Sequence, residues 1–178
     1  MAITLNNTDI TFSDGSAQIA AAKMLNVVQT VKYDVFTTAS TTYVDIPGLS
    51  ATITPKSTSN KILIFVAFTT SDSSYGVGTI YPKYFNLCRN GSAIGIGDAR
   101  GSNVSCSTGS GAVYSANYPS NSNWISWMDS PATTSAVTYN VQCRIIGSVT
   151  LSVGGSYSSG NAYNSSTIST ITLMEVAP

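Results

Sequence analysis

The stretch from Lys61 to Thr69, KILIFVAFT, constrains the fold more than any other part of the chain. The residues from Ile62 to Phe68 are all apolar, and several are β-branched or aromatic, which favours a strand over a helix. Successive side chains of a strand point to opposite faces, so this strand presents apolar residues on both. An antiparallel sandwich buries only one face of a strand. The other face, with Leu63 and Phe65, needs cover from a loop, an arm or a second subunit, and we predict these two residues as subunit contacts.

Short alternating segments separated by turn signals continue along most of the chain. The clearest runs from Val137 to Ile145, and Asn90-Gly91 is the strongest short hairpin signal available. We expect about nine or ten short strands and no long helix. The pattern is typical of an antiparallel sandwich or barrel, and eight principal strands with long crossing loops favour a jelly roll over an immunoglobulin-like pair of sheets. The predicted fold is therefore all-β, a jelly-roll-like antiparallel β-sandwich with an extended N-terminal arm.

The first 24 residues differ from the rest. Two short alternating segments place Ile3 with Leu5 and Ile10 with Phe12, and residues 16–23 could form a short helix. These pieces are too short for a core of their own, and a frayed tail is the plain alternative. We interpret residues 1–24 as an arm that adds strands to the edge of a neighbour's sheet, with the four apolar residues as its docking contacts.

Residues 25–178 form the predicted sandwich domain, and its regular pattern starts at once. The residues predicted to share one face of its first strand are Leu25, Val27, Val31, Tyr33 and Val35, with Thr30, Lys32 and Asp34 opposite.

Charge is sparse, at 9% charged residues and a formal net charge of zero. Typical domains have nearer 25% charged residues. The balance provides no electrostatic footprint for nucleic acid or an anionic membrane, so we expect neither as a partner. The N-terminus has neither the basic nor the apolar region of a signal peptide.

The chain contains no histidine, which excludes His-based triads and imidazole metal sites. Among the scattered acids, Asp72, Asp98 and Asp129 are predicted to lie in loops, where they could meet as a catalytic pair. Turn hydrogen bonding explains them more simply. We therefore expect no enzyme activity, no catalytic residues, no cofactor and no metal.

Three cysteines, Cys88, Cys106 and Cys143, are an odd number without metal-binding spacing. We interpret them as buried or free thiols made in a reducing cytoplasm. A Cys88–Cys143 disulfide is compatible with the sequence but is not indicated by it.

Aromatic residues in or beside loops carry most of the functional interest. Tyr75, Tyr157 and Trp124 are candidates for stacking on sugar rings. The alternative is packing within the sandwich or at a subunit interface, which aromatic residues also favour.

Several segments resemble small β-rich virion proteins of tailed phages, with related segments in cyanophage capsid-decoration (cement) proteins, head fibres and tail-fibre tips. They are TFSDGS at 11–16, ITPKSTSNKILI at 53–64, IGIGDARG at 94–101, MDSPATTSAVTY at 128–139 and ITLMEVAP at 171–178. The resemblance implies a homotrimer, a jelly-roll-like module and no enzyme activity, with no catalytic residues to transfer.

Within that family, a short arm before a single module favours a capsid cement protein over a fibre. We expect it to be assembled in the host cytoplasm and to sit on the capsid surface, with the major capsid protein as its partner. The alternative is a fibre tip or receptor-binding module that recognises a host cell-surface glycan.

Overall fold

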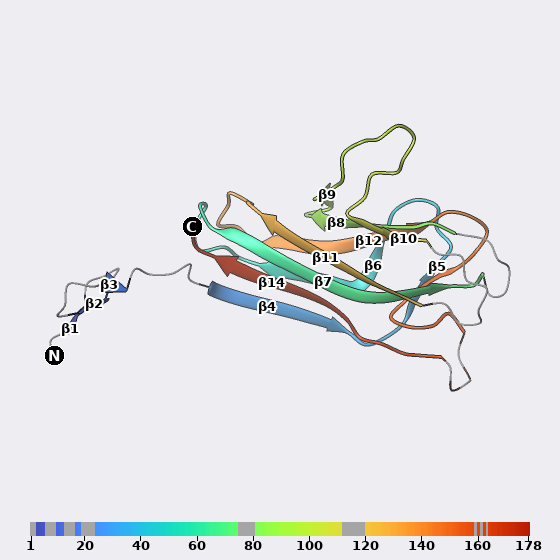
Figure 1. Cartoon of the computed structure of the whole chain (residues 1–178), viewed down its shortest axis with the longest axis horizontal. Helices are drawn as coiled ribbons and strands as arrows, with labels where there is room; N and C mark the ends of the chain where they lie inside the picture. Colours follow the sequence, from blue (N-terminus) through green and yellow to red (C-terminus); the bar gives the residue numbers. More distant parts are fainter. Residues whose placement is uncertain are drawn as a thin grey trace.

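The computed structural model describes residues 3–5, 10–12, 17–18, 24–74, 81–111, 120–158, 160, 162 and 164–178. The predicted all-β antiparallel sandwich is confirmed, because every regular element in these ranges is a strand. No helix long and apolar enough to cross a membrane occurs in these ranges. Two sheets face one another and enclose the core (Figure 1). A third, small sheet is formed by the strands before residue 24.

The first sheet, here called the β7 sheet, contains the predicted strand at its centre. Its strands are β4 (Met24–Lys32), β5 (Phe36–Thr38), β7 (Lys61–Asp72), β11 (Asn121–Asp129), β13 (Leu151–Val153) and β14 (Ser169–Val176). β4 and β5 share one edge, β14 and β13 lie next to them, β7 follows, and β11 forms the other edge. All of these pairings are antiparallel.

The second sheet, the β12 sheet, contains β6 (Val44–Ile53), β8 (Lys83–Arg89), β9 (Ser92–Ile94), β10 (Thr108–Ser110) and β12 (Val137–Ile145). Its order is β6, β12, β8, with β9 and β10 both on the outer edge of β8. The chain passes repeatedly between the sheets. It runs from β5 to β6, back to β7, across to β8, back to β11, across to β12 and finally back to β13.

The inner faces of the two sheets form one hydrophobic core. The inward residues of β7, Ile62, Ile64, Val66 and Phe68, are all buried there. The rings of Phe68 and Phe85 meet edge to face, with centroids 4.8 Å apart, and so join the centres of the two sheets. The predicted strand at Val137–Ile145 is β12, and its apolar row is buried.

Charged residues of β8 join the two sheets at both ends of the core. At one end the Lys83 ammonium lies 2.5 Å from the Asp72 carboxylate of β7, and both side chains are buried. At the other end Arg89 donates to both carboxylate oxygens of Asp129 on β11, at 3.1 and 3.0 Å. The Tyr139 hydroxyl donates to the same carboxylate at 2.6 Å. These acids therefore hold the sandwich together.

Glu175 fixes the turn between β6 and β7 from inside the sandwich. Its buried carboxylate accepts hydrogen bonds from the Lys56 amide and the Asn60 side chain, both at 2.6 Å. Two segments that carry the sequence resemblance, 53–64 and 171–178, thus meet at one carboxylate. These two hydrogen bonds tie the turn between β6 and β7 to the last strand, β14.

The predicted hairpin at Asn90-Gly91 is confirmed. The turn joins β8 to β9, and both residues have positive φ, 48° and 82°. This is the conformation of a type I′ turn, which Asn and Gly tolerate best.

Three details differ from the sequence predictions. Ala17–Gln18 forms strand β3, so the helix expected over 16–23 is wrong there, and its other residues lie outside the described ranges. Asp72 and Asp129 end strands instead of lying in loops. The described ranges contain fourteen strands, where about nine or ten were expected.

Strand β4 faces the core with Asn26, Val28, Thr30 and Lys32, so only one of its inward residues is apolar. Register with β14 puts Val27 and Val31 on the outer face, while Lys32 is buried. The Lys32 stem packs 3.8 Å from the Cβ position of Gly48, and its ammonium reaches Asp34 at 2.8 Å. The alternation predicted from Leu25 is real, but its apolar side faces away from the core.

Replacing Asp72 by Asn should lower the free energy of unfolding by about 3 kcal/mol, because it leaves the Lys83 ammonium buried without a counter-charge. Chemical denaturation measures the loss. The matched control is Asp98→Asn, in an exposed loop, which should change stability by less than about 0.5 kcal/mol. Equal effects of the two substitutions on the free energy of unfolding would show that the buried ion pair does not stabilise the fold more than a surface acid does.

The same pair predicts a pH dependence. Burial alone would raise the pKa of Asp72, but hydrogen bonds from Lys83 and Ser74 outweigh it and hold the pKa below its ordinary value of 3.8. The stabilisation is complete above the unfolded pKa and is lost as the pH falls through the folded pKa. The stability difference between the unaltered chain and Asp72→Asn should therefore shrink between about pH 4 and pH 2. A difference that stays constant in urea titrations at stepped pH would contradict this assignment.

Candidate assembly surfaces

The outer face of the β7 sheet is apolar and has no covering element among the described residues. Figure 1 looks onto this face, where β4, β14, β7 and β11 lie side by side. The predicted contacts Leu63 and Phe65 lie at its centre, and Phe65 is 43% exposed. Directly across the register lie Met128 and Met174 beside Leu63. The second apolar face of the central strand is thus real and is left open by the single chain.

The apolar surface continues across both edges of the sheet. Trp124 on β11 lies opposite Ala67 and is 77% exposed, and Val27 on β4 is 48% exposed. Met24 and Met128 are likewise exposed. Apolar patches of this kind mark interaction sites on soluble domains.

Charge is almost absent from this surface. Among the described outward residues of β4, β14, β7 and β11, Lys61 alone is charged, and it lies at one end. The remaining polar residues are mainly Thr, Ser and Gln, such as Gln29, which donates to the Thr172 hydroxyl at 2.9 Å. Aromatic and Met enrichment with loss of charge is the composition of an interface core.

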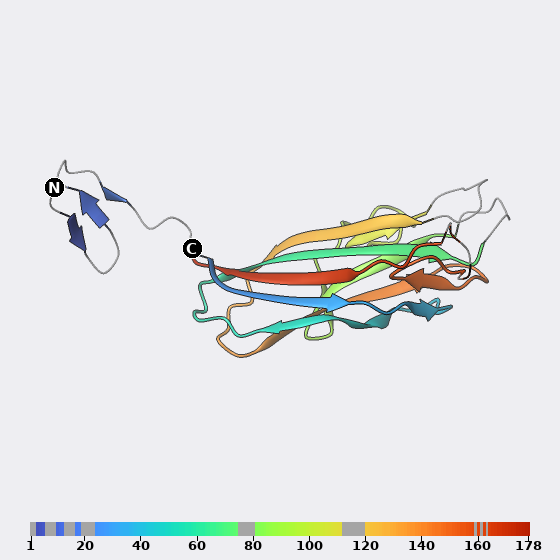
Figure 2. The ribbon, with the colours of Figure 1, turned by 90° about the horizontal axis from the view of Figure 1, so that it is seen from below.

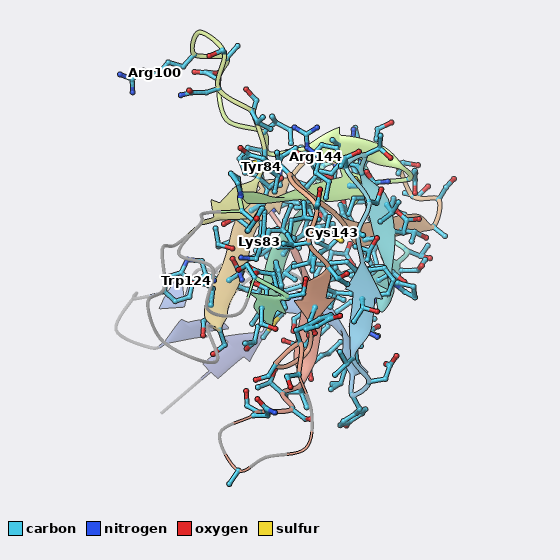
Figure 3. The ribbon with its side chains drawn as sticks, turned by 90° about the vertical axis from the view of Figure 1, so that its right-hand side faces the viewer. Lys83, Tyr84, Arg100, Trp124, Cys143 and Arg144 are labelled. Carbon is cyan, nitrogen blue, oxygen red and sulfur yellow. The ribbon has the colours of Figure 1, made fainter. Side chains whose placement is uncertain are left out.

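The outer face of the β12 sheet has the opposite character. Asn140 and Gln142 both donate to the same carboxylate oxygen of Asp45, at 2.8 and 2.9 Å. The Arg144 guanidinium lies over the ring of Tyr84, 5.2 Å from its centroid (Figure 3). Polar and charged side chains are frequent on this face, and several interact with one another, so the two outer faces differ in kind.

The predicted arm forms strands β1 (Ile3–Leu5), β2 (Ile10–Phe12) and β3 (Ala17–Gln18), which pair with one another. The backbone register pairs Ile3 with Phe12 and Leu5 with Ile10, so the four predicted docking positions lie on two paired strands. Figures 1 and 2 place this small sheet apart from the sandwich, beyond the end where β4 begins. Addition of these strands to a neighbour's sheet remains a prediction.

The acidic residues do not converge. Asp129 lies opposite Ile62 on β7, while Asp72 is at the other end of that strand, about 33 Å away at 3.3 Å per residue. Asp98 is exposed in the loop between β9 and β10. No cluster of Cys, Asp and Glu suited to a metal ion occurs in the part of the chain that the structure describes.

The three cysteines are free thiols. Cys88 lies opposite Asn140 and Cys143 opposite Phe85, which are on opposite faces of the β12 sheet, so these two cannot form a disulfide. Burial raises the pKa of Cys88 to about 11 and that of Cys143 to about 12. Both thiols therefore stay protonated and unreactive near neutral pH.

The three candidates for a glycan contact do not form one site. Trp124 projects from β11, at one edge of the β7 sheet. Tyr157 lies in the loop after β13, next to Val35 on the side of the opposite edge strand β5, and is 46% exposed. Tyr75 lies outside the described residues. The spatial neighbour of Tyr157 that the sequence analysis missed is Asn164, for which no local sequence signal exists.

Comparison of the chain with protein-family models and with curated proteins yields no match in either case. Functional inference accordingly rests on the surfaces described above.

Substitutions on the apolar face should weaken self-association without unfolding the chain. We expect Phe65→Ser and Trp124→Ser each to raise the dissociation constant at least about 30-fold, as for interface anchors. Analytical ultracentrifugation provides the measurement.

The control is Tyr33→Ser, because Tyr33 is 76% exposed, as open as Trp124, but lies after β4 ends. It should leave association unchanged. A chain that remains monomeric at high concentration, or three variants that behave alike, would show that this face is not a subunit interface.

Proposed function

We propose that this chain is a non-enzymatic structural protein of a virion, specifically a capsid cement protein that forms a homotrimer. The main support is the apolar outer face of the β7 sheet, which carries almost no charge and remains exposed although the rest of the domain is well packed. A structural protein that functions in an assembly has a use for such a face, since its partner supplies the cover.

The charge pattern favours further copies of this chain as the partner that covers this face. Identical copies can bring this face together without like-charge repulsion, because nearly all of its residues are neutral. The opposite outer face, with its internal Asp45 hydrogen bonds, remains hydrated. The count of three subunits comes from the resemblance to phage decoration proteins.

The strand order gives a second line of support. We assign the alternating passage between the sheets, with β9 and β10 beside β8, to a jelly roll made of two Greek keys. That architecture recurs in viral capsid proteins, although a fold by itself does not establish a function.

Attachment to the shell is assigned to the residues before β4. The paired strands β1 and β2, with Ile3, Leu5, Ile10 and Phe12, would lie on the major capsid protein. Three copies of one weak contact act together in a trimer, so attachment becomes strong through multivalency.

Deletion of residues 1–23 tests this role and leaves β4 complete. The full chain should co-sediment with shells of the cognate major capsid protein, and the truncated chain should not. The truncated chain should keep the circular-dichroism spectrum of the folded protein and the same number of subunits. A mass of three times 18.6 kDa by light scattering is expected for the full chain.

A sharper variant replaces the four apolar hairpin residues by Ser, with Thr4→Ser and Thr11→Ser on the same two strands as the control. Full shell occupancy by the truncated chain or by the fourfold variant would reject docking through the arm.

A further inference from the structure

A hollow of about 360 Å³ opens at the end of the sandwich opposite the start of β4. Figure 3 looks at the molecule from this end. The hollow lies between Val35, just before β5, and the loop that joins β13 to β14, and its size is near the lower limit of small-molecule sites.

The base of this loop is a short antiparallel stem. Gly155 pairs with Ser166, and the amide of Ser156 donates to the carbonyl of Ser165 at 2.8 Å. A Cβ on Gly154 would come within 3.0 Å of the Asp34 carbonyl oxygen, so glycine at this position lets the stem approach the segment before β5. The stem therefore holds one wall of the hollow against the other.

Tyr157 and Asn164 follow this stem on its two sides, each one residue beyond the Ser156–Ser165 hydrogen bond. Both line the hollow. The stem therefore places a phenol ring and an amide on the lining of one hollow.

The amide of Asn164 has unused hydrogen-bonding capacity. Its oxygen and its nitrogen are both buried, and neither has a hydrogen-bond partner among the described residues. An unpaired buried amide is unfavourable. A small rotation of this side chain would present one acceptor and two donor hydrogens to a molecule in the hollow.

The uncharged residues that line the hollow indicate which class of ligand it could bind. Besides Val35, Tyr157 and Asn164, the described lining residues are serines and a glycine, and none is charged. Phosphate, sulfate or carboxylate groups would find no cation, and a cationic ligand would find no carboxylate. Hydroxyl groups match the amide and the serines, and the face of a sugar ring packs on an aromatic ring.

We propose that this hollow is a binding site for a neutral saccharide, with Tyr157 packing on the ring and Asn164 hydrogen-bonding its hydroxyl groups. The site lies at the other end of the sandwich from residues 1–23 and is separate from the apolar face of the β7 sheet. It does not depend on the cement role.

Saturation-transfer NMR on the full chain tests the site with four probes: methyl α-glucopyranoside, methyl β-galactopyranoside, methyl α-mannopyranoside and N-acetylglucosamine. Ligands this small are expected to bind at about millimolar affinity, which suits this method. N-Acetylneuraminic acid is the anionic comparison and should not bind. At least one neutral probe should receive saturation on its ring protons.

Variants locate the binding. Asn164→Ala and Tyr157→Ala should each raise the dissociation constant of the saccharide that binds about tenfold. Tyr157→Phe keeps the aromatic ring and should leave this dissociation constant unchanged. Tyr33→Ser is the matched control, because Tyr33 is an aromatic residue that is 76% exposed and does not line the hollow; this variant should bind as the unaltered chain does. The proposal is overturned if no neutral probe binds the folded chain, or if Asn164→Ala binds the probe as well as the unaltered chain does. Neither result bears on shell binding, which is measured separately.

Discussion

The structure depends on a strand that is apolar on both sides. The inner row of β7 supplies the middle of the core, and any sheet that accepts this strand must leave Leu63 and Phe65 facing outward. The neighbouring strands extend this apolar surface: β11 adds Trp124, and β4 turns Val27 and Val31 outward while burying Lys32. Burying apolar area is the main favourable term in association, so this face is the strongest physical reason to regard the chain as a subunit.

Several of the few charged residues lie inside the sandwich. Lys83 and Arg89 lie at the two ends of β8 and reach across to acids of the facing sheet, and Glu175 binds the turn before β7. Breaking a buried pair is far more costly than losing a surface pair. Sparse overall charge therefore goes together with acids that are individually important, and their partners account for Asp72 and Asp129 without any catalytic role.

The candidate surfaces lie on different parts of the chain. Self-association is assigned to a broad sheet face, attachment to residues before β4, and saccharide recognition to a loop at the opposite end. Such a separation lets each contact form without disturbing the others. It also means that each can be removed by a local change on the outside of the sandwich.

Much of the secondary structure could be predicted from local pattern. The alternation of Val137–Ile145, the Asn90-Gly91 turn and the apolar run at 61–69 each depend on neighbours in sequence, because strand faces and tight turns are set by adjacent residues. The same local reasoning placed Leu63 and Phe65 correctly on a second face. It failed for Ala17–Gln18, which pairs with the preceding strand β2, and for the ends of β7 and β11, which pair with each other across a long distance in sequence.

The sequence by itself determined that this is an all-β chain with more apolar strand surface than one core can bury. Only the tertiary structure decided which residues meet: Lys83 with Asp72, and Arg89 with Asp129. Alternation tells which side of a strand a residue occupies, but the register between strands far apart in sequence is set by the packing of the whole sandwich. That register brings each of these buried acids to its counter-charge.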